Sequence, residues 1–159
     1  LGETIIMLTG GIVYLYGVGG GLTTGKRSVD IALQAELMGA YGVVVNAPTS
    51  NEVINKMYNR IDIPIIATVV TDHDDYKGKL DAGARILNVS GGAKTAEIVR
   101  KIRNEYGREL PIIATGGPTD ESILRTIEAG ANSITYTPPC TAEIFAGVME
   151  KYRNDKGSK

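Results

Sequence analysis

Ile63-Pro64-Ile65-Ile66-Ala67-Thr68 and Leu110-Pro111-Ile112-Ile113-Ala114-Thr115 are nearly the same six-residue stretch, and their prolines stand 47 positions apart. A second element, a Gly-Ala pair that leads into an apolar run, occurs at residues 39–40, 83–84 and 130–131. A period near 47 residues is long enough for two strand–helix pairs. The two repeats therefore predict a series of βα units built in pairs.

Short apolar runs bounded by turn residues predict six strands, near 12–18, 42–47, 64–70, 86–90, 111–115 and 133–137. Their near-continuous apolar character is typical of parallel strands that are covered on both faces. Alternating strands and helices predict an α/β fold with right-handed crossovers. Two architectures fit this pattern. The repeat favours a TIM-barrel-like fold with about six of the eight βα units, as in a truncated barrel. The length of 159 residues favours a flavodoxin-like doubly wound open sheet.

We expect a single βα-repeat domain over residues 1–159, because no linker or low-complexity tract interrupts the pattern. Residues 1–11 are ambiguous: they could form a strand that makes a hairpin through Gly10-Gly11, or the tail of a helix. Residues 154–159 are a polar tail that we expect to be disordered. Helices are predicted between the strands and after the last one, the weakest over 75–82, with Ser50, Thr119 and Thr141 near their starts. A six-stranded portion of a barrel would leave open sheet edges, so we also expect self-association.

The composition excludes some classes of partner. The net charge is −1, from 17 basic and 18 acidic residues, so nothing points to nucleic acid or to an anionic membrane surface. A single cysteine, Cys140, excludes an intrachain disulfide and fits a reducing compartment. No stretch approaches the roughly 20 apolar residues that a membrane span needs. We therefore expect a cytoplasmic protein whose partner is a small metabolite.

A glycine-rich loop follows the first of the six strands. Residues 20–26, Gly-Gly-Leu-Thr-Thr-Gly-Lys, satisfy the pattern G-x-x-x-x-G-K of a P-loop, but Arg27 stands where a Mg²⁺-ligating Ser or Thr is required. A nucleotide P-loop is therefore the weakest interpretation. A general phosphate- or carboxylate-binding loop and a tight structural turn both remain open, and the anion-binding candidates are Gly19, Gly20, Gly21 and Lys26.

Two glycine pairs occur later, each at the end of a strand and before a helix: Ser90-Gly91-Gly92 and Thr115-Gly116-Gly117. Bare backbone N–H groups in such loops bind anions in phosphate-binding barrels. The alternative is that glycine merely permits a tight βα turn. After the last strand the chain has Pro138-Pro139, which offers no N–H donors and weakens the case for an anion site.

Polar side chains with other roles also follow the strands. Asp72 and His73 are the candidates for proton transfer, or for holding a divalent metal, and no other cofactor is expected. The alternative is that His73 is simply solvated, and that Asp74 or Asp75 caps a helix. Asn46, Ser90 and Thr137 each stand seven residues after the glycine of a Gly-Ala pair, so they should face the same side of the sheet and orient a substrate.

Together these motifs resemble an uncharacterised bacterial family of barrel-like proteins, found in clostridia and lactobacilli and generically labelled hydrolases. The resemblance covers roughly residues 12–152 and rests on Gly17-Val18-Gly19-Gly20-Gly21, residues 42–48, residues 88–92, residues 114–117 and residues 134–139. It implies a barrel-like fold and a hydrolase-like label without a settled reaction. More distantly, the strand-end glycines are similar to those of phosphate-binding TIM-barrel enzymes.

The leading expectation is therefore a hydrolase or lyase that acts on a small phosphorylated or carboxylated metabolite at the carboxyl ends of the strands. The alternative is a non-catalytic βα scaffold, truncated or engineered, with a vestigial site.

Overall fold

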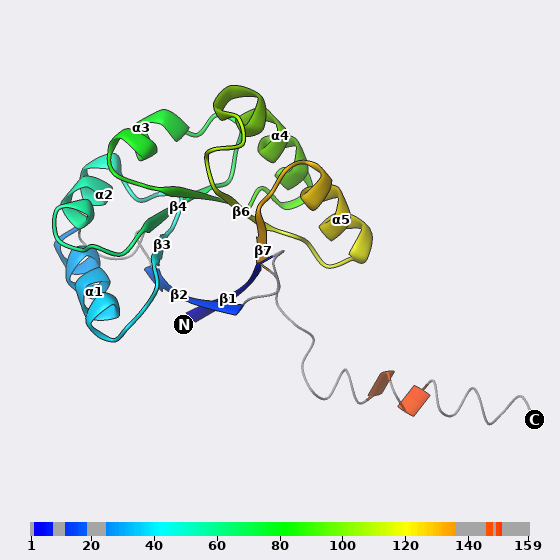
Figure 1. Ribbon diagram of the computed structural model, residues 1–159, viewed down its shortest axis with the longest axis horizontal. Helices are drawn as coiled ribbons and strands as arrows, with labels where there is room; N and C mark the ends of the chain where they lie inside the picture. The colour runs from blue at the N-terminus through cyan, green and yellow to red at the C-terminus, as the bar shows by residue number, and fades with distance from the viewer. Residues whose placement is uncertain (1, 8–11, 19–24, 136–145, 148, 151–159) are drawn as a thin grey trace, which may run out of the picture.

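The computed structural model describes residues 2–7, 12–18, 25–135, 146–147 and 149–150, with side chains from Arg27 onward. The described strands form one closed barrel, and they follow one another around it in chain order (Figure 1). The strands are β1 (Gly2–Met7), β2 (Ile12–Val18), β3 (Val43–Val45), β4 (Ile65–Val69), β5 (Ile86–Val89), β6 (Ile112–Thr115) and β7 (Ser133–Thr135). The helices are α1 (Gly25–Leu37), α2 (Asn51–Tyr58), α3 (Tyr76–Asp81), the short 3₁₀ helix η1 (Gly92–Lys94), α4 (Thr95–Tyr106) and α5 (Asp120–Glu128).

Strand β1 closes the barrel. It runs antiparallel to both of its neighbours, with Ile5 opposite Val13 of β2 on one side and opposite Thr135 of β7 on the other. The strands from β2 to β7 pair in parallel, and they confirm the six predicted strands and the TIM-barrel-like α/β fold. Residues 2–7 are thus a strand paired in a hairpin with β2, not the tail of a helix.

The closed ring corrects two expectations. The flavodoxin-like open sheet is wrong, because β7 does not end the sheet but pairs with β1. The expectation of open sheet edges is wrong for the same reason: a closed barrel has no edge strand. Self-association remains a prediction, but its argument from unpaired edges no longer applies.

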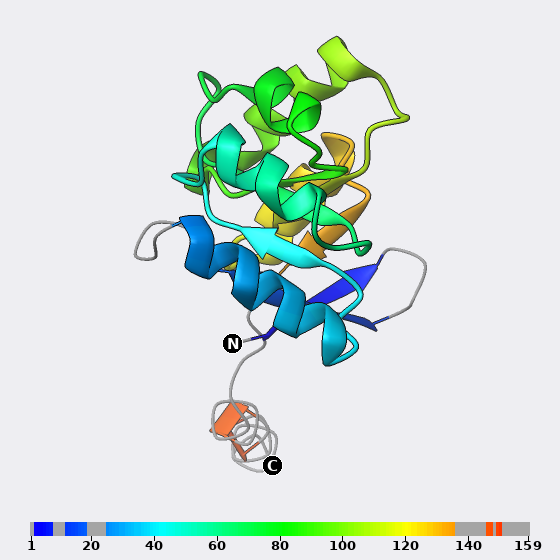
Figure 2. The same ribbon diagram turned by 90° about the vertical axis from the view of Figure 1, so that its left-hand side faces the viewer.

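The side chains of β3 to β7 alternate between the outside and the inside of the barrel, because successive residues of a strand point to opposite faces. One set faces outward into a large core shared with the helices, where Ile54 and Met57 of α2 and Ile102 of α4 are fully buried. The other set, Val44, Ile66 and Ile113 with Ile86 beside them, forms a separate cluster inside the barrel. Figure 2 shows α1 and α2 lying side by side against the wall of the barrel.

Two of the predicted helix starts are confirmed. The Ser50 side chain accepts a hydrogen bond from Val53 N at the start of α2, and Thr119 caps α5. Thr141 and most of the helix predicted after β7 lie outside the described residues, as does the polar tail 154–159. Of the helices that the structure describes, none has the length and hydropathy needed to span a membrane.

The amino end of the barrel is held by one guanidinium group. Arg103, near the end of α4, donates from Nε to Gly130 O at 2.7 Å, and its other nitrogens bond to two carbonyls of the α4–β6 turn and to Asn132 Oδ1. Asn132 Oδ1 also accepts from Ile112 N at 2.8 Å. Arg103 therefore ties the helix to the chain segments that enter β6 and β7.

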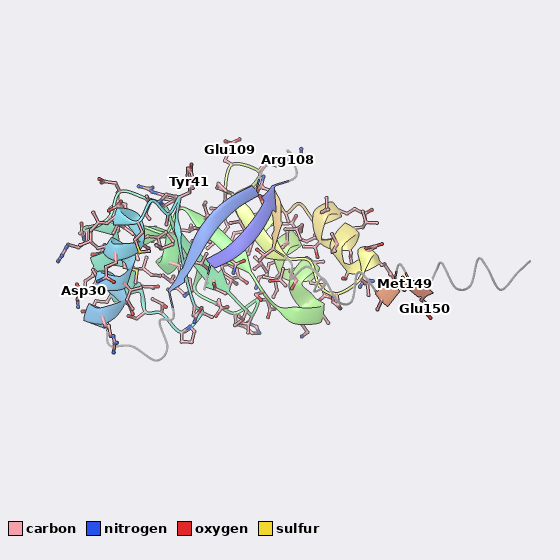
Figure 3. All side chains as sticks on the ribbon, turned by 90° about the horizontal axis from the view of Figure 1, so that it is seen from below. Asp30, Tyr41, Arg108, Glu109, Met149 and Glu150 are labelled. Carbon is pink, nitrogen blue, oxygen red and sulfur yellow. The ribbon has the colours of Figure 1, made fainter. Side chains whose placement is uncertain are left out.

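Figure 3 shows Arg108 and Glu109 of the α4–β6 turn projecting on the same side of the molecule as Tyr41, which precedes β3.

Arg103→Ala should lower the free energy of unfolding by about 2–3 kcal/mol, because it leaves several carbonyl groups without their charged donor. Arg100→Ala is the matched control: Arg100 is exposed on the same helix, and its loss should change stability by less than about 0.5 kcal/mol. Urea unfolding followed by circular dichroism measures both. If the two substitutions lower the free energy of unfolding equally, the hydrogen bonds of Arg103 do not stabilise the contact of α4 with the segments that enter β6 and β7.

Candidate functional site

The inside of the barrel changes from apolar to polar toward the carboxyl ends of β4 to β7. Above the apolar cluster, the positions with the same inward parity hold hydroxyl and amide side chains, and register places Thr68 beside Asn88 and Thr115 beside Thr135. Ser90 continues the same face of β5 by two residues. We call Thr68, Asn88, Ser90, Thr115 and Thr135 the polar layer.

Most of the polar layer is joined in hydrogen-bonded pairs across neighbouring strands. Asn88 Nδ2 donates to Thr68 Oγ1 at 3.2 Å, and both residues are buried. Thr115 Oγ1 donates to Ser90 Oγ at 3.1 Å, and this pair is half-buried. The hydroxyl of Thr135 is buried but has no hydrogen-bond partner among the described residues. A buried hydroxyl left without a partner lowers stability by about 1–3 kcal/mol. The Thr135 hydroxyl could therefore still form a hydrogen bond with a ligand.

The two glycine loops leave the barrel from the Ser90–Thr115 pair, and in each loop the amide of the first glycine already has a partner. The amide of Gly91 donates to Thr95 Oγ1 at 3.1 Å, and that of Gly116 donates to Thr135 O at 3.1 Å. Each first glycine also packs closely: a Cβ at Gly91 would lie 2.4 Å from Ile98 Cδ1. The first glycine of each pair is therefore structural, as the alternative interpretation held.

The second glycine of each loop differs from the first. Gly92 and Gly117 have φ values of +60° and +83°, in the region that favours glycine. Within the part of the chain that the structure describes, neither of their amides has a hydrogen-bond partner. Each amide comes two residues after a member of the Ser90–Thr115 hydrogen bond, so each hydroxyl is followed in sequence by one free donor.

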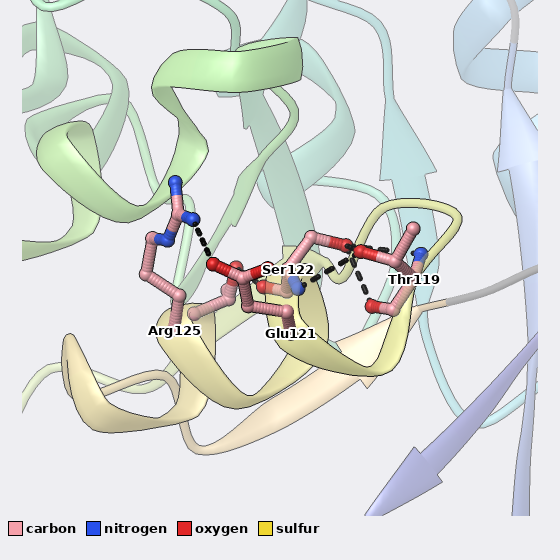
Figure 4. A network of polar contacts seen from close by, with 5 residues as sticks. Thr119, Glu121, Ser122 and Arg125 are labelled. Carbon is pink, nitrogen blue, oxygen red and sulfur yellow. Dashed lines mark hydrogen bonds and ion pairs between the residues drawn. The ribbon is translucent and has the colours of Figure 1, made fainter.

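The start of α5, which follows Gly117, is already satisfied by its own side chains. Thr119 Oγ1 accepts from Ser122 N at 3.2 Å, and Ser122 Oγ accepts from Thr119 N at 3.1 Å, which is a capping box (Figure 4). The same view shows the exposed ion pair between Glu121 and Arg125 one turn further along. The free donor of this loop is therefore the amide of Gly117 and not the end of the helix.

Asp72 and His73 lie in the loop between β4 and α3, and neither takes part in the hydrogen bonds of the polar layer. The His73 side chain is 88% exposed, and its Nε2 lies 3.5 Å from Asp72 Oδ1. The main-chain carbonyl of Asp72 accepts a hydrogen bond from Lys101 Nζ of α4. Among the described residues, no group of three or more His, Cys, Asp and Glu side chains could hold a metal ion. The role of Asp72 and His73 in proton transfer stays a prediction.

The other two carboxylates of this loop have structural partners. Asp74 Oδ2 accepts from the amides of Val70 and Thr71 at 2.7 and 2.9 Å. Asp75 caps α3 by accepting from Gly78 N at 2.8 Å, and this bond is the main cause of its lowered pKa. Asp75 is thus the helix cap that the alternative interpretation expected.

Asn46 and Ser90 share the inward parity that the Gly-Ala repeat predicted, but the structure shows no bond between them. Asn46 is exposed at the end of β3, whereas the partner of Ser90 is Thr115. The third member of the predicted set, Thr137, lies outside the described residues, as do Gly19, Gly20 and Gly21. The backbone of Lys26 is in the first turn of α1, and its side chain is not among those described.

Sequence reasoning missed three members of the polar layer, although the repeats hold the signal for them. Thr68 occupies the same position in its six-residue repeat as Thr115, which was a candidate. Asn88 and Thr135 each stand five residues after the glycine of a Gly-Ala pair, two before Ser90 and Thr137. Comparing the repeats position by position would have found all three.

Lys79 of α3 is a buried cation beside this end of the barrel, and it was also missed. It is 5% exposed, and Nζ donates to Ala47 O at 3.2 Å and to Thr49 O at 3.4 Å in the loop after β3. Burial lowers the pKa of its ammonium group, and the charges of Asp74 and Asp75 oppose that shift. Lys79 therefore fixes the loop that carries Asn46, at the cost of a desolvated charge.

No protein-family model matches the chain, and no curated protein matches it. Among solved structures it is similar to mandelate oxidase variants. One, with benzaldehyde bound, has a TM-score of 0.65 at 16% identity over 77% of this chain and 48% of that chain. Another, with a monooxide FMN adduct, has a TM-score of 0.64 at 18% identity over 76% of this chain and 46% of that chain. The chain spans about half the length of these structures, and at such identity the likeness shows the TIM-barrel-like fold alone.

The lowered pKa of Lys79 predicts a pH dependence of stability. Between its folded pKa and its ordinary value of 10.5, the unfolded chain binds more protons than the folded chain, so stability should rise with pH. Lys79→Met should remove this rise when free energies of unfolding are compared at about pH 7 and about pH 9.5. That window lies below the ordinary pKa of 10.0 for Tyr76, which burial raises to about 12.

Lys77→Met is the matched control, because Lys77 is exposed on the same helix and its pKa is raised by the hydrogen bond to Asp81. This variant should keep the rise. If Lys79→Met and the unmodified chain gain the same stability between the two pH values, Lys79 is not the desolvated cation described above.

Proposed function

We propose that this protein binds a small phosphorylated or carboxylated metabolite at the carboxyl end of its barrel. The observation that carries the proposal is the pair of glycine loops, in which the free amides of Gly92 and Gly117 each follow a member of the Ser90–Thr115 hydroxyl pair by two residues. Backbone amides and hydroxyls that converge from adjacent strands are donors suited to anion oxygens. Gly91 and Gly116 shape the loops and supply no free donor.

One cation near these loops suits an anion. Lys94 stands exposed two residues beyond Gly92, and the exposed Asp120 and Glu121 of the first turn of α5 follow the other loop. An exposed lysine near free amides adds a long-range attraction for negative charge. The predicted glycine loop at 19–21 and Lys26 remain candidates for further donors.

For the reaction we propose a hydrolase- or lyase-type step on the bound metabolite. Proton transfer would fall to Asp72 and His73, the paired carboxylate and imidazole of the β4–α3 loop, with Asn46 and Thr137 helping to orient the substrate. This assignment follows the predicted resemblance to the uncharacterised bacterial family of barrel-like proteins. The competing proposal, a non-catalytic scaffold with a vestigial site, is favoured by the 88% exposure of His73.

FMN is present in one of the mandelate oxidase structures, and it ends in a phosphate ester. The Gly92 and Gly117 amides and the Ser90 and Thr115 hydroxyls could bind this phosphate ester as they could bind any other. They do not favour a phosphate attached to a flavin over other phosphates. The proposal is therefore binding of the phosphate or carboxylate group, and no chemical step is assigned to a flavin.

Inorganic phosphate should raise the melting temperature of the protein, by an amount equivalent to about 2.7 kcal/mol at one hundred times its dissociation constant. Replacing Ser90 by Ala and Thr115 by Val together should weaken phosphate binding about tenfold or more, because both hydroxyl donors are lost. Thermal melts and isothermal titration measure the two effects.

Thr126→Val is the control for the double variant, since the Thr126 hydroxyl bonds only to Ser122 O within α5. It should leave phosphate binding unchanged. If chloride at equal ionic strength stabilises the protein as much as phosphate does, there is no specific anion site and the scaffold interpretation is correct.

A further inference from the structure

We infer that the metabolite carries hydroxyl groups next to its anionic group, and that the polar layer binds this polyol or sugar portion. The inference rests on the proposed function, because Ser90 and Thr115 belong both to the anion loops and to the polar layer. Thr68, Asn88 and Thr135 are the remaining members of the polar layer, on β4, β5 and β7.

The chemistry of the polar layer selects the class of ligand. All five side chains are neutral, and each can both donate and accept hydrogen bonds. Such a set matches hydroxyl groups, which also donate and accept. It gives no countercharge to a second ionised group, and it offers an alkyl chain little apolar surface in exchange for desolvating its hydroxyls and amide. A hydroxylated carbon chain is therefore the best match.

Stability does not explain why these side chains are polar. Nearer the amino ends of β3 to β6 the inward positions hold Val44, Ile66, Ile86 and Ile113, and only β7 has a polar residue there, Ser133, so apolar residues suit most of that part of the interior. Replacing two hydrogen-bonded buried partners by apolar groups of the same shape is often neutral or stabilising. Hydroxyl and amide groups on four successive strands thus need a reason other than packing, and a ligand is such a reason.

Thr135 provides the independent observation. Its Oγ1 is buried and has no partner in the part of the chain that the structure describes, although Thr115 lies beside it in register. The Thr115 hydroxyl is bonded to Ser90 and not to Thr135. An incoming hydroxyl could satisfy this orphaned atom, and the energy recovered would contribute to ligand affinity instead of to folding.

The test compares three probes by isothermal titration: inorganic phosphate, glycerol phosphate, and propyl phosphate, which has the same carbon chain without hydroxyls. Glycerol phosphate should bind about tenfold or more tightly than propyl phosphate, since at least one additional hydrogen bond is formed in a desolvated site. Thr135→Val should reduce this ratio toward one and leave the affinity for inorganic phosphate unchanged. Because the exchange removes an unpaired hydroxyl, it should not lower the melting temperature.

Thr126→Val is again the control for replacing a threonine by valine. It should leave the ratio of the affinities for glycerol phosphate and propyl phosphate unchanged. If Thr135→Val does not fold, Thr68→Val combined with Asn88→Leu provides the comparison, because it removes a complete hydrogen-bonded pair of the polar layer and leaves no unpaired donor. Propyl phosphate binding as tightly as glycerol phosphate would overturn the inference while the proposed anion site stands. A preference for glycerol phosphate that persists in the valine variant would show that the polar layer does not cause it, which also overturns the inference. Failure of all three probes would overturn the proposed function, and the inference with it.

Discussion

The double pairing of β1 is the constraint on which the rest of the structure depends. Six parallel strands make a curved sheet with two unsatisfied edges, and β1 occupies both by pairing antiparallel with β2 and β7. Closure turns one face of the sheet into an interior, so that Val44, Ile66 and Ile113 are enclosed by the barrel as well as by their neighbours. Without that strand the polar layer would lie on an open surface, where water would satisfy its hydroxyls and a ligand would gain little from them.

The interior is therefore graded along the barrel axis. Apolar side chains fill it beside the middle of the strands, and hydroxyl and amide groups replace them where β4 to β7 end. The adjoining loops extend the gradient with the amides of Gly92 and Gly117. The middle of the barrel interior thus serves packing, and the end next to the glycine loops offers groups that can bind. Both sets of side chains face inward because alternate residues of each strand do so.

The sequence predicts the six parallel strands well, because each is a compact apolar run with turn residues on both sides. It does not settle the role of residues 2–7, since the pairing of Ile5 with Thr135 joins segments 130 positions apart and has no local signal. In the site, the glycine pairs are recognisable as motifs, but which glycine keeps a free amide depends on tertiary partners such as Thr95 Oγ1. The burial of Lys79 is equally invisible, because it arises from the distant carbonyls of Ala47 and Thr49.

Arg103 has a consequence for how such a protein can change over evolutionary time. Its guanidinium group ties α4 to the segments that enter β6 and β7, at the end of the barrel opposite the glycine loops. Because the fold is secured at that end, substitutions in the loops at the other end need not compromise it. A barrel fastened in this way can exchange one ligand preference for another by small loop changes, and its descendants can diverge in chemistry while they keep the same architecture.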